Sequence, residues 1–234
     1  MSLKALRAIL EKQSNPEQAK ILMRFFKTGI GEYGEGDEFL GIKVPVSRKI
    51  AKQFKELSLS EIQELLDSKV HEERLIGLFI LVEQYRKADA EKMQAIYEFY
   101  LKNAKRVNNW DLVDLSAEKI MGAYLMDKDK RILFKLAKSK NLWERRIAIM
   151  STFYFIKNSF YNTTFAISDM LLKDEHDLIH KAVGWMLREI GNRNLKVEED
   201  YLKKHYKNMP RTMLRYAIEK FPEKRRQAYL KGKI

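Results

Sequence analysis

Residues 71–85 of this chain read HEERLIGLFILVEQY, in which charged side chains open a long apolar stretch with aromatic members. Apolar residues recur at helical spacing here and along most of the sequence, whereas runs that alternate apolar and polar residues are scarce. The 234 residues include four prolines, so few positions interrupt such helices. The sequence therefore predicts an all-α fold.

Three later segments repeat this pattern of a charged opening and an apolar, aromatic-rich continuation. They read LWERRIAIMSTFYFIK from Leu142, LIHKAVGWMLREIG from Leu178 and PRTMLRYAIEKF from Pro210. NNWDLVDLSAEKIMGAYL from Asn108 fits between the segments from His71 and Leu142. The openings align at Arg74, Asp114, Arg146, Lys181 and Thr212. Their spacing of about 31 to 40 residues is in the range of HEAT-type helix pairs, which stack into a curved solenoid. We therefore expect a HEAT-like α-solenoid whose charged openings share the concave face.

The charge balance indicates an anionic partner. Lys and Arg number 45 against 32 Asp and Glu, which gives a formal net charge of +13. A basic concave surface would suit nucleic acid better than an acidic protein. No Pro-, Gly- or Ser-rich linker divides the sequence, so we expect one domain over residues 1–234.

Cysteine is absent, which excludes disulfides, thiolate metal sites and cysteine nucleophiles and is typical of a reducing cytosol. The first residues, MSLKALRAILEKQSNPEQ, mix charged side chains among the apolar ones. They therefore predict neither a signal peptide nor a membrane span. We expect a cytoplasmic protein, associated with the nucleoid when bound to DNA, and infer no membrane and no obligate protein partner.

Residues 26–49, FKTGIGEYGEGDEFLGIKVPVSRK, interrupt the helical pattern with several glycines. A phosphate-binding loop of the Walker or Rossmann kind is not indicated, because no Gly-Lys-Ser/Thr follows and no strand precedes. The segment is interpreted as a structural turn between the first helices. Lys43 and Arg48 beside it are candidates for contact with a DNA backbone.

Residues 108–114, NNWDLVD, are the most informative candidate site. An Asn cap is expected to open a helix, and the i, i+4 spacing then puts Trp110 and Asp114 on one face. In a basic groove Asp114 would be a lone anion that repels DNA. Such a residue would need a functional role that offsets this repulsion. The alternative is that Trp110 packs in the core and Asp114 pairs with a nearby cation. Trp143 and Trp185 are likewise either core residues or π faces for bases or for a cationic ligand.

Other chemistries find little support in the sequence. His176 and His180 are spaced i, i+4, but no HExxH motif and no third ligand accompany them, so no metal is predicted. Neither a Ser-His-Asp set nor a Gly-x-Ser-x-Gly elbow is found.

The sequence resembles the DNA alkylation repair family of HEAT-like-repeat glycosylases, the AlkD type. The resemblance covers most of the chain and rests on FKTGIGEYGEGDEFLGIKVP, NWDLVD, LWERRIAI and HKAVGWMLREIG, in the family's order. It implies a catalytic set of Trp110, Asp114, Arg146 and Trp185. It further implies DNA-backbone contacts by Lys43, Arg48, Arg146, Lys181 and Arg188.

Two departures from the family pattern bear on the range of substrates. Phe25 stands where better-studied members have a tyrosine, and Asn109 precedes Trp110 where an aromatic residue can occur. The resemblance implies a glycosylase that removes alkylated purines, of the 3-methyladenine or 7-methylguanine type, from double-stranded DNA without a cofactor. The alternatives are a non-catalytic DNA-binding paralogue that recognises branched or distorted DNA, and a HEAT-type protein-interaction scaffold, which the basic charge disfavours.

Overall fold

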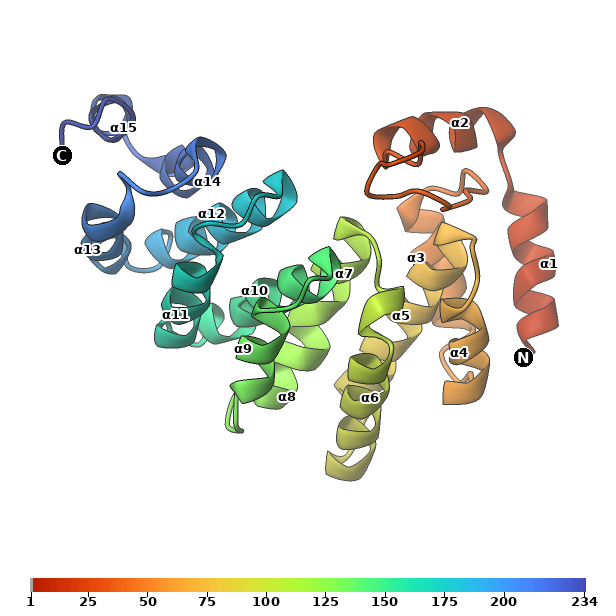
Figure 1. Cartoon of the computed structure of the whole chain (residues 1–234). Helices are drawn as coiled ribbons and strands as arrows, with labels where there is room; N and C mark the ends of the chain where they lie inside the picture. The colour runs from red at the N-terminus through yellow and green to blue at the C-terminus, as the bar shows by residue number, and fades with distance from the viewer. Residues whose placement is uncertain (1) are drawn as a thin grey trace. The chain divides into compact units, whose positions relative to one another are not determined.

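The computed structural model describes residues 2–234 (Figure 1). Within these residues the regular structure is helical and no strand forms, apart from one isolated bridge between Glu38 and Val70. The prediction of an all-α fold is therefore confirmed. The helices group into two compact units, the first ending at Ser116 and the second running from Ala117 to Ile234. No helix of residues 2–234 has both the length and the apolar character needed to cross a membrane.

The first unit is built around one buried helix. Its helices are α1 (Leu3–Gln13), α2 (Pro16–Phe25), α3 (Val44–Gln53), α4 (Leu59–Leu66), α5 (His71–Lys87), α6 (Ala90–Lys102), the 3-10 turn η1 (Ala104–Arg106) and most of α7 (Trp110–Ala117). Helix α5 packs against α3, α4 and α6, and every residue from His71 to Leu81 is buried. A helix without a polar face is stable only inside such a layer.

The glycine-rich segment connects α2 to α3, as predicted, although its last residues from Val44 onward form the first turns of α3. Gly41 has a left-handed φ of 81°, and a Cβ atom there would lie 2.1 Å from the Asn15 carbonyl oxygen, so only glycine fits. The backbone N–H groups of Leu40, Gly41 and Ile42 donate to the buried carboxylate of Glu72 at 3.0, 2.9 and 3.1 Å. The segment therefore binds an anion, but this anion is the protein's own side chain.

The second unit has two central helices. It contains the π-helical turn η2 (Glu118–Gly122), α8 (Ala123–Leu125), α9 (Arg131–Ala137), α10 (Leu142–Lys157), α11 (Asn162–Leu171), α12 (Asp177–Gly191), α13 (Leu195–His205), α14 (Arg211–Ala217), η3 (Ile218–Lys220) and α15 (Glu223–Leu230). Helix α10 packs against α9, α11 and α12, and α12 packs against α13 and α14. Gly184 permits the close approach of α14, because a Cβ atom there would lie 2.4 Å from the Met213 carbonyl oxygen.

Candidate active site

Helix α7 carries the first two candidate residues. It begins at Trp110, as expected directly after an Asn, and the Asn109 side-chain oxygen accepts a hydrogen bond from the Trp110 N–H at 2.8 Å. Asp114 follows one turn later in the same helix, and both Trp110 and Asp114 are half-buried. Burial raises the pKa of the Tyr100 hydroxyl, and the charge of Asp114 raises it further, which places that carboxylate close to Tyr100.

Trp110 rests on an aromatic stack. Its ring lies nearly parallel to that of Phe26, with centroids 5.3 Å apart and an interplanar angle of 19°. Phe26 stacks in turn on Phe39, at 5.1 Å and 18°. Phe25, which is 61% exposed, meets Trp110 edge-on at 5.8 Å. Trp110 therefore packs on the core with part of its ring and shares its exposed side with another aromatic residue.

A buried charge cluster that the sequence did not predict holds the first turn of α7. The His71 ring is 2% exposed and lies between two carboxylates, with Nε2 2.9 Å from Asp111 and Nδ1 3.3 Å from Asp37. Asp37 also pairs with Arg74, whose Nη2 lies 2.7 Å away. We call Asp37, His71, Arg74 and Asp111 the clamp, because they link α5 and the glycine-rich segment to α7.

The clamp contains a protonated histidine. Burial lowers the pKa of His71, but the charge of Asp111 and the hydrogen bonds to Asp111 and Asp37 outweigh it and raise the pKa to about 9. Burial likewise raises the pKa of Asp37, but the His71 hydrogen bond and the Arg74 charge bring it below its usual range. Two carboxylates and two cations therefore compensate one another in a buried site.

The remaining catalytic candidates lie in the second unit. Arg146 of α10 is 4% exposed, and its Nη1 donates to the Leu178 carbonyl oxygen at 2.5 Å, in the first turn of α12. Trp185 of α12 is half-buried, with its ring 6.0 Å from that of Phe153 at an angle of 54°. Its indole N–H donates to Glu189 at 3.3 Å. Trp143 is buried, as the core interpretation predicts.

The predicted backbone-binding cations differ in their surroundings. Lys43 precedes α3 and is exposed, and Arg48 on α3 places its guanidinium 4.3 Å from the ring centroid of Phe79. In the second unit Lys181 pairs with Asp177 at 2.6 Å, and Arg188 pairs with Glu219. The contacts of all four residues with DNA remain predictions.

The two histidines considered as metal ligands have structural partners. His176 caps α12, with Nδ1 accepting the Leu178 N–H at 3.1 Å, and His180 hydrogen-bonds the Asp174 carbonyl oxygen. Burial lowers the pKa of His176. Across residues 2–234 no group of three or more His, Asp or Glu side chains is placed to hold a metal ion.

Comparison with known proteins supplies the family. A family model described as "DNA alkylation repair enzyme" matches residues 6–221, which is nearly the whole chain. The chain belongs to the DNA alkylation repair enzyme family. This confirms the resemblance read from the sequence, and membership implies a DNA substrate.

A solved structure of a predicted DNA alkylation repair enzyme from Enterococcus faecalis is similar to this family member. The two are 19% identical, the match covers 90% of this chain and 98% of that chain, and the TM-score is 0.71. At this level of identity the likeness supports the fold. Among curated proteins none matches the chain.

In this alkylation repair family member, the predicted catalytic residues are distributed over both units. Trp110 and Asp114 share α7 in the first unit, and Arg146 contacts the helix that carries Lys181 and Trp185 in the second. That the two groups act on one lesion remains a prediction. Of the clamp residues, Asp37 and Asp111 lie in motifs that carry the family resemblance, whereas His71 and Arg74 do not. His71 is 34 positions from Asp37 and 40 from Asp111, so no local spacing pairs them.

Proposed function

We propose that this protein is a DNA glycosylase that hydrolyses the N-glycosidic bond of alkylated purines in duplex DNA. The observation that carries the proposal is the arrangement on α7. An aromatic ring seated on Phe26 and a half-buried carboxylate one turn away lie on a helix whose start is fixed by a buried ion cluster. A rigid aromatic face next to a carboxylate suits a cationic sugar or base.

The chemistry follows from the leaving group. A purine alkylated at N3 or N7 carries a positive charge, so it departs with the electron pair of the C–N bond and leaves an oxocarbenium-like sugar. Asp114 would lie against this sugar, stabilise the developing cation and position the water that attacks C1′, as carboxylates do in glycoside hydrolysis. The water then loses a proton and an abasic site remains. No metal or nucleotide takes part.

The second unit would supply the rest of the site. Trp185 would face the lesion nucleotide together with Trp110. Arg146, whose Nη1 donates to the Leu178 carbonyl oxygen, would bind a nearby phosphate through two of its other N–H hydrogens. Lys43, Arg48, Lys181 and Arg188 would contact the DNA backbone and contribute salt-dependent affinity. We further propose that residues 1–234 form one HEAT-like solenoid domain with this basic face on its concave side. The resemblance to the family implies that the damaged base needs no protein pocket, so bulky adducts would be tolerated.

The test uses a duplex with a single 7-methylguanine, EDTA in the buffer and alkaline cleavage to reveal abasic sites. We expect wild-type protein to produce the cleaved strand and Asp114→Asn to produce none while binding the duplex equally well. Equal cleavage by both proteins would contradict the role of Asp114. Binding without cleavage by either protein, on 7-methylguanine and 3-methyladenine duplexes alike, would favour the non-catalytic DNA-binding alternative.

A further inference from the structure

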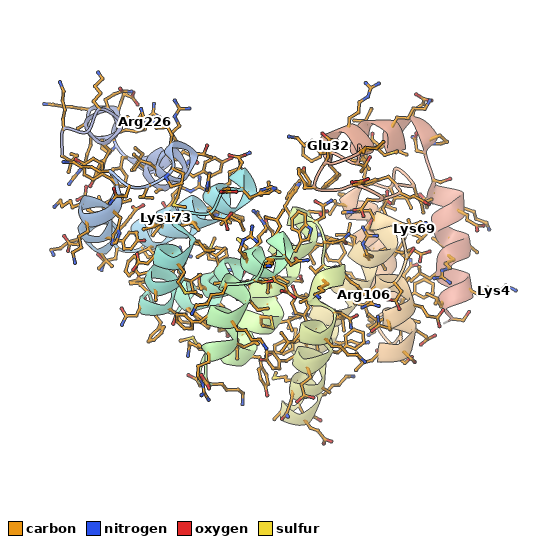
Figure 2. The ribbon with its side chains drawn as sticks, viewed as in Figure 1. Lys4, Glu32, Lys69, Arg106, Lys173 and Arg226 are labelled. Carbon is orange, nitrogen blue, oxygen red and sulfur yellow. The ribbon has the colours of Figure 1, made fainter. Side chains whose placement is uncertain are left out.

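A second basic site lies on the first unit and has no part in the proposed reaction. It is an open pocket of about 310 Å³. Its cations come from three parts of the chain: Lys69 in the loop before α5, Arg74 within α5, and Lys105 and Arg106 in the turn after α6. Figure 2 labels Lys69 and Arg106 among them. Residues brought together from separate elements in this way form a site that no local sequence pattern predicts.

Arg74 is the buried wall of this pocket. The residue is 3% exposed, its Nη1 donates to the Ser68 carbonyl oxygen at 2.7 Å, and its Nη2 lies 2.7 Å from Asp37. Its Nε–H is buried and finds no hydrogen-bond partner among residues 2–234. A buried charged donor without an acceptor lowers the stability of the folded protein. An acceptor from outside the chain would satisfy the Arg74 Nε–H.

The carboxylates that line the pocket already have partners. Asp37 is bound by His71 and Arg74, Asp67 pairs with Arg106, and Glu35 accepts the Gly31 N–H at 3.0 Å. Lys69 and Lys105 are exposed. Their charges give the pocket a net positive charge, which favours the binding of an anion.

We propose that this pocket binds a phosphate group, with Arg74 at the base and Lys69 and Lys105 at the rim. Guanidinium and ammonium groups that converge from several directions match the several oxygens of a phosphate. The buried side-chain oxygen of Asn108, which also lines the pocket and has no partner within residues 2–234, would accept the phosphate's own proton or a neighbouring hydroxyl. The phosphate belongs either to a DNA backbone or to a free phosphate or monoester. The proposal is independent of glycosylase activity.

The experiment observes Arg74 directly in the full-length protein. Arginine side-chain Nε–H signals are recorded by NMR after labelling with ¹⁵N-arginine, and inorganic phosphate is added at constant ionic strength. The Arg74 signal is identified by its loss in Arg74→Lys or, if that variant does not fold, by through-space contacts to Ser68. We expect a saturable shift of this signal. No shift up to tens of millimolar phosphate, or an equal shift with chloride, would mean an adventitious ion only and would overturn the proposal.

Surface variants provide the matched comparison, because they leave the buried clamp intact. Lys69→Ala combined with Lys105→Ala should weaken phosphate binding about fivefold or more, since each exposed charge contributes modestly. Lys12→Ala combined with Lys52→Ala removes the same charge from exposed positions of the same unit outside the pocket, and should leave the affinity unchanged. Equal affinities of the two double variants would contradict the proposed rim.

A short unmodified duplex then identifies the source of the phosphate. If the duplex moves the Arg74 signal and inorganic phosphate competes with it, the pocket holds a backbone phosphate. If the duplex binds without moving that signal, the pocket takes a free phosphate or monoester. Because unmodified DNA is used, these outcomes do not depend on whether Asp114 catalyses excision.

Discussion

The two candidate tryptophans are held in different ways. Trp110 in the first unit stacks on Phe26, and its helix is anchored through Asp111 to the buried His71 of α5. Trp185 in the second unit has a tilted neighbour, Phe153, and hydrogen-bonds Glu189 four residues later in its own helix. The first position therefore depends on residues distant in sequence, whereas the second depends largely on its own helix. Substitutions of the residues that support Trp110 should therefore lower the free energy of unfolding more than substitutions beside Trp185.

The largest effect is expected from His71→Ala. The substitution leaves the Asp37 and Asp111 carboxylates buried without the cation between them, which should lower the free energy of unfolding by about 4 kcal/mol. Urea unfolding followed by circular dichroism measures the loss. His180→Ala in the second unit is the control, and removing its single hydrogen bond to a carbonyl oxygen should cost about 1 kcal/mol. Equal losses of unfolding free energy would contradict the conclusion that the Trp110 site depends more on distant residues than the Trp185 site.

A smaller difference is expected from the rings beside the tryptophans. Phe26 is buried, and Phe26→Ala should lower the free energy of unfolding by about 3 kcal/mol and alter the fluorescence of Trp110. Phe153 is half-buried, so Phe153→Ala should cost about 1 kcal/mol. Thermal unfolding monitored by tryptophan emission compares the two. If Phe153→Ala proved the more destabilising, the stack below Trp110 would not be the better-packed site.

The third expected effect is a dependence of stability on pH. Because the pKa of His71 is raised to about 9 by Asp111 and Asp37 in spite of burial, its contribution to stability is complete below the unfolded pKa and is lost as the pH rises through about 9. The free energy of unfolding should fall by about 2 kcal/mol between about pH 7 and about pH 9 from this group.

A second buried group requires a control for that measurement. Burial, and then the charge of Glu199, raise the pKa of Glu198 in the second unit to about 9, so Glu198 also lowers stability as the pH rises. The His71 part is therefore the difference between the pH profiles of wild type and His71→Gln, and Glu198→Gln isolates the other part. Parallel profiles of wild type and His71→Gln would exclude a protonated His71 in the folded protein.

The sequence predicted the helices well because their signals are local. The apolar stretches from His71, Leu142, Leu178 and Pro210 all became helices, and α7 begins directly after Asn109, where the motif predicted a helix. These features depend on neighbours within a few turns of the chain. Local propensity and spacing are enough to determine them.

The clamp and the phosphate pocket could not be predicted in this way. Asp37, His71 and Asp111 come from a loop and two helices, and their meeting depends on how α5 and α7 pack with the loop. The glycines of residues 26–49 lack the pattern of a phosphate loop, and nothing in their spacing showed that Glu72 would occupy the backbone N–H groups. Contacts between residues so far apart follow from tertiary packing.

The most direct test of the account compares the two aspartates of α7, since Asp111 is assigned to holding the helix and Asp114 to the reaction. Single-turnover excision of 7-methylguanine is measured at saturating DNA, with melting temperatures recorded in parallel. We predict that Asp114→Asn, at temperatures where it is folded, loses at least about 100-fold in rate. Asp111→Asn should melt earlier and excise at nearly the wild-type rate while folded. A wild-type excision rate for Asp114→Asn, or an equal loss of rate in both variants, would contradict the account.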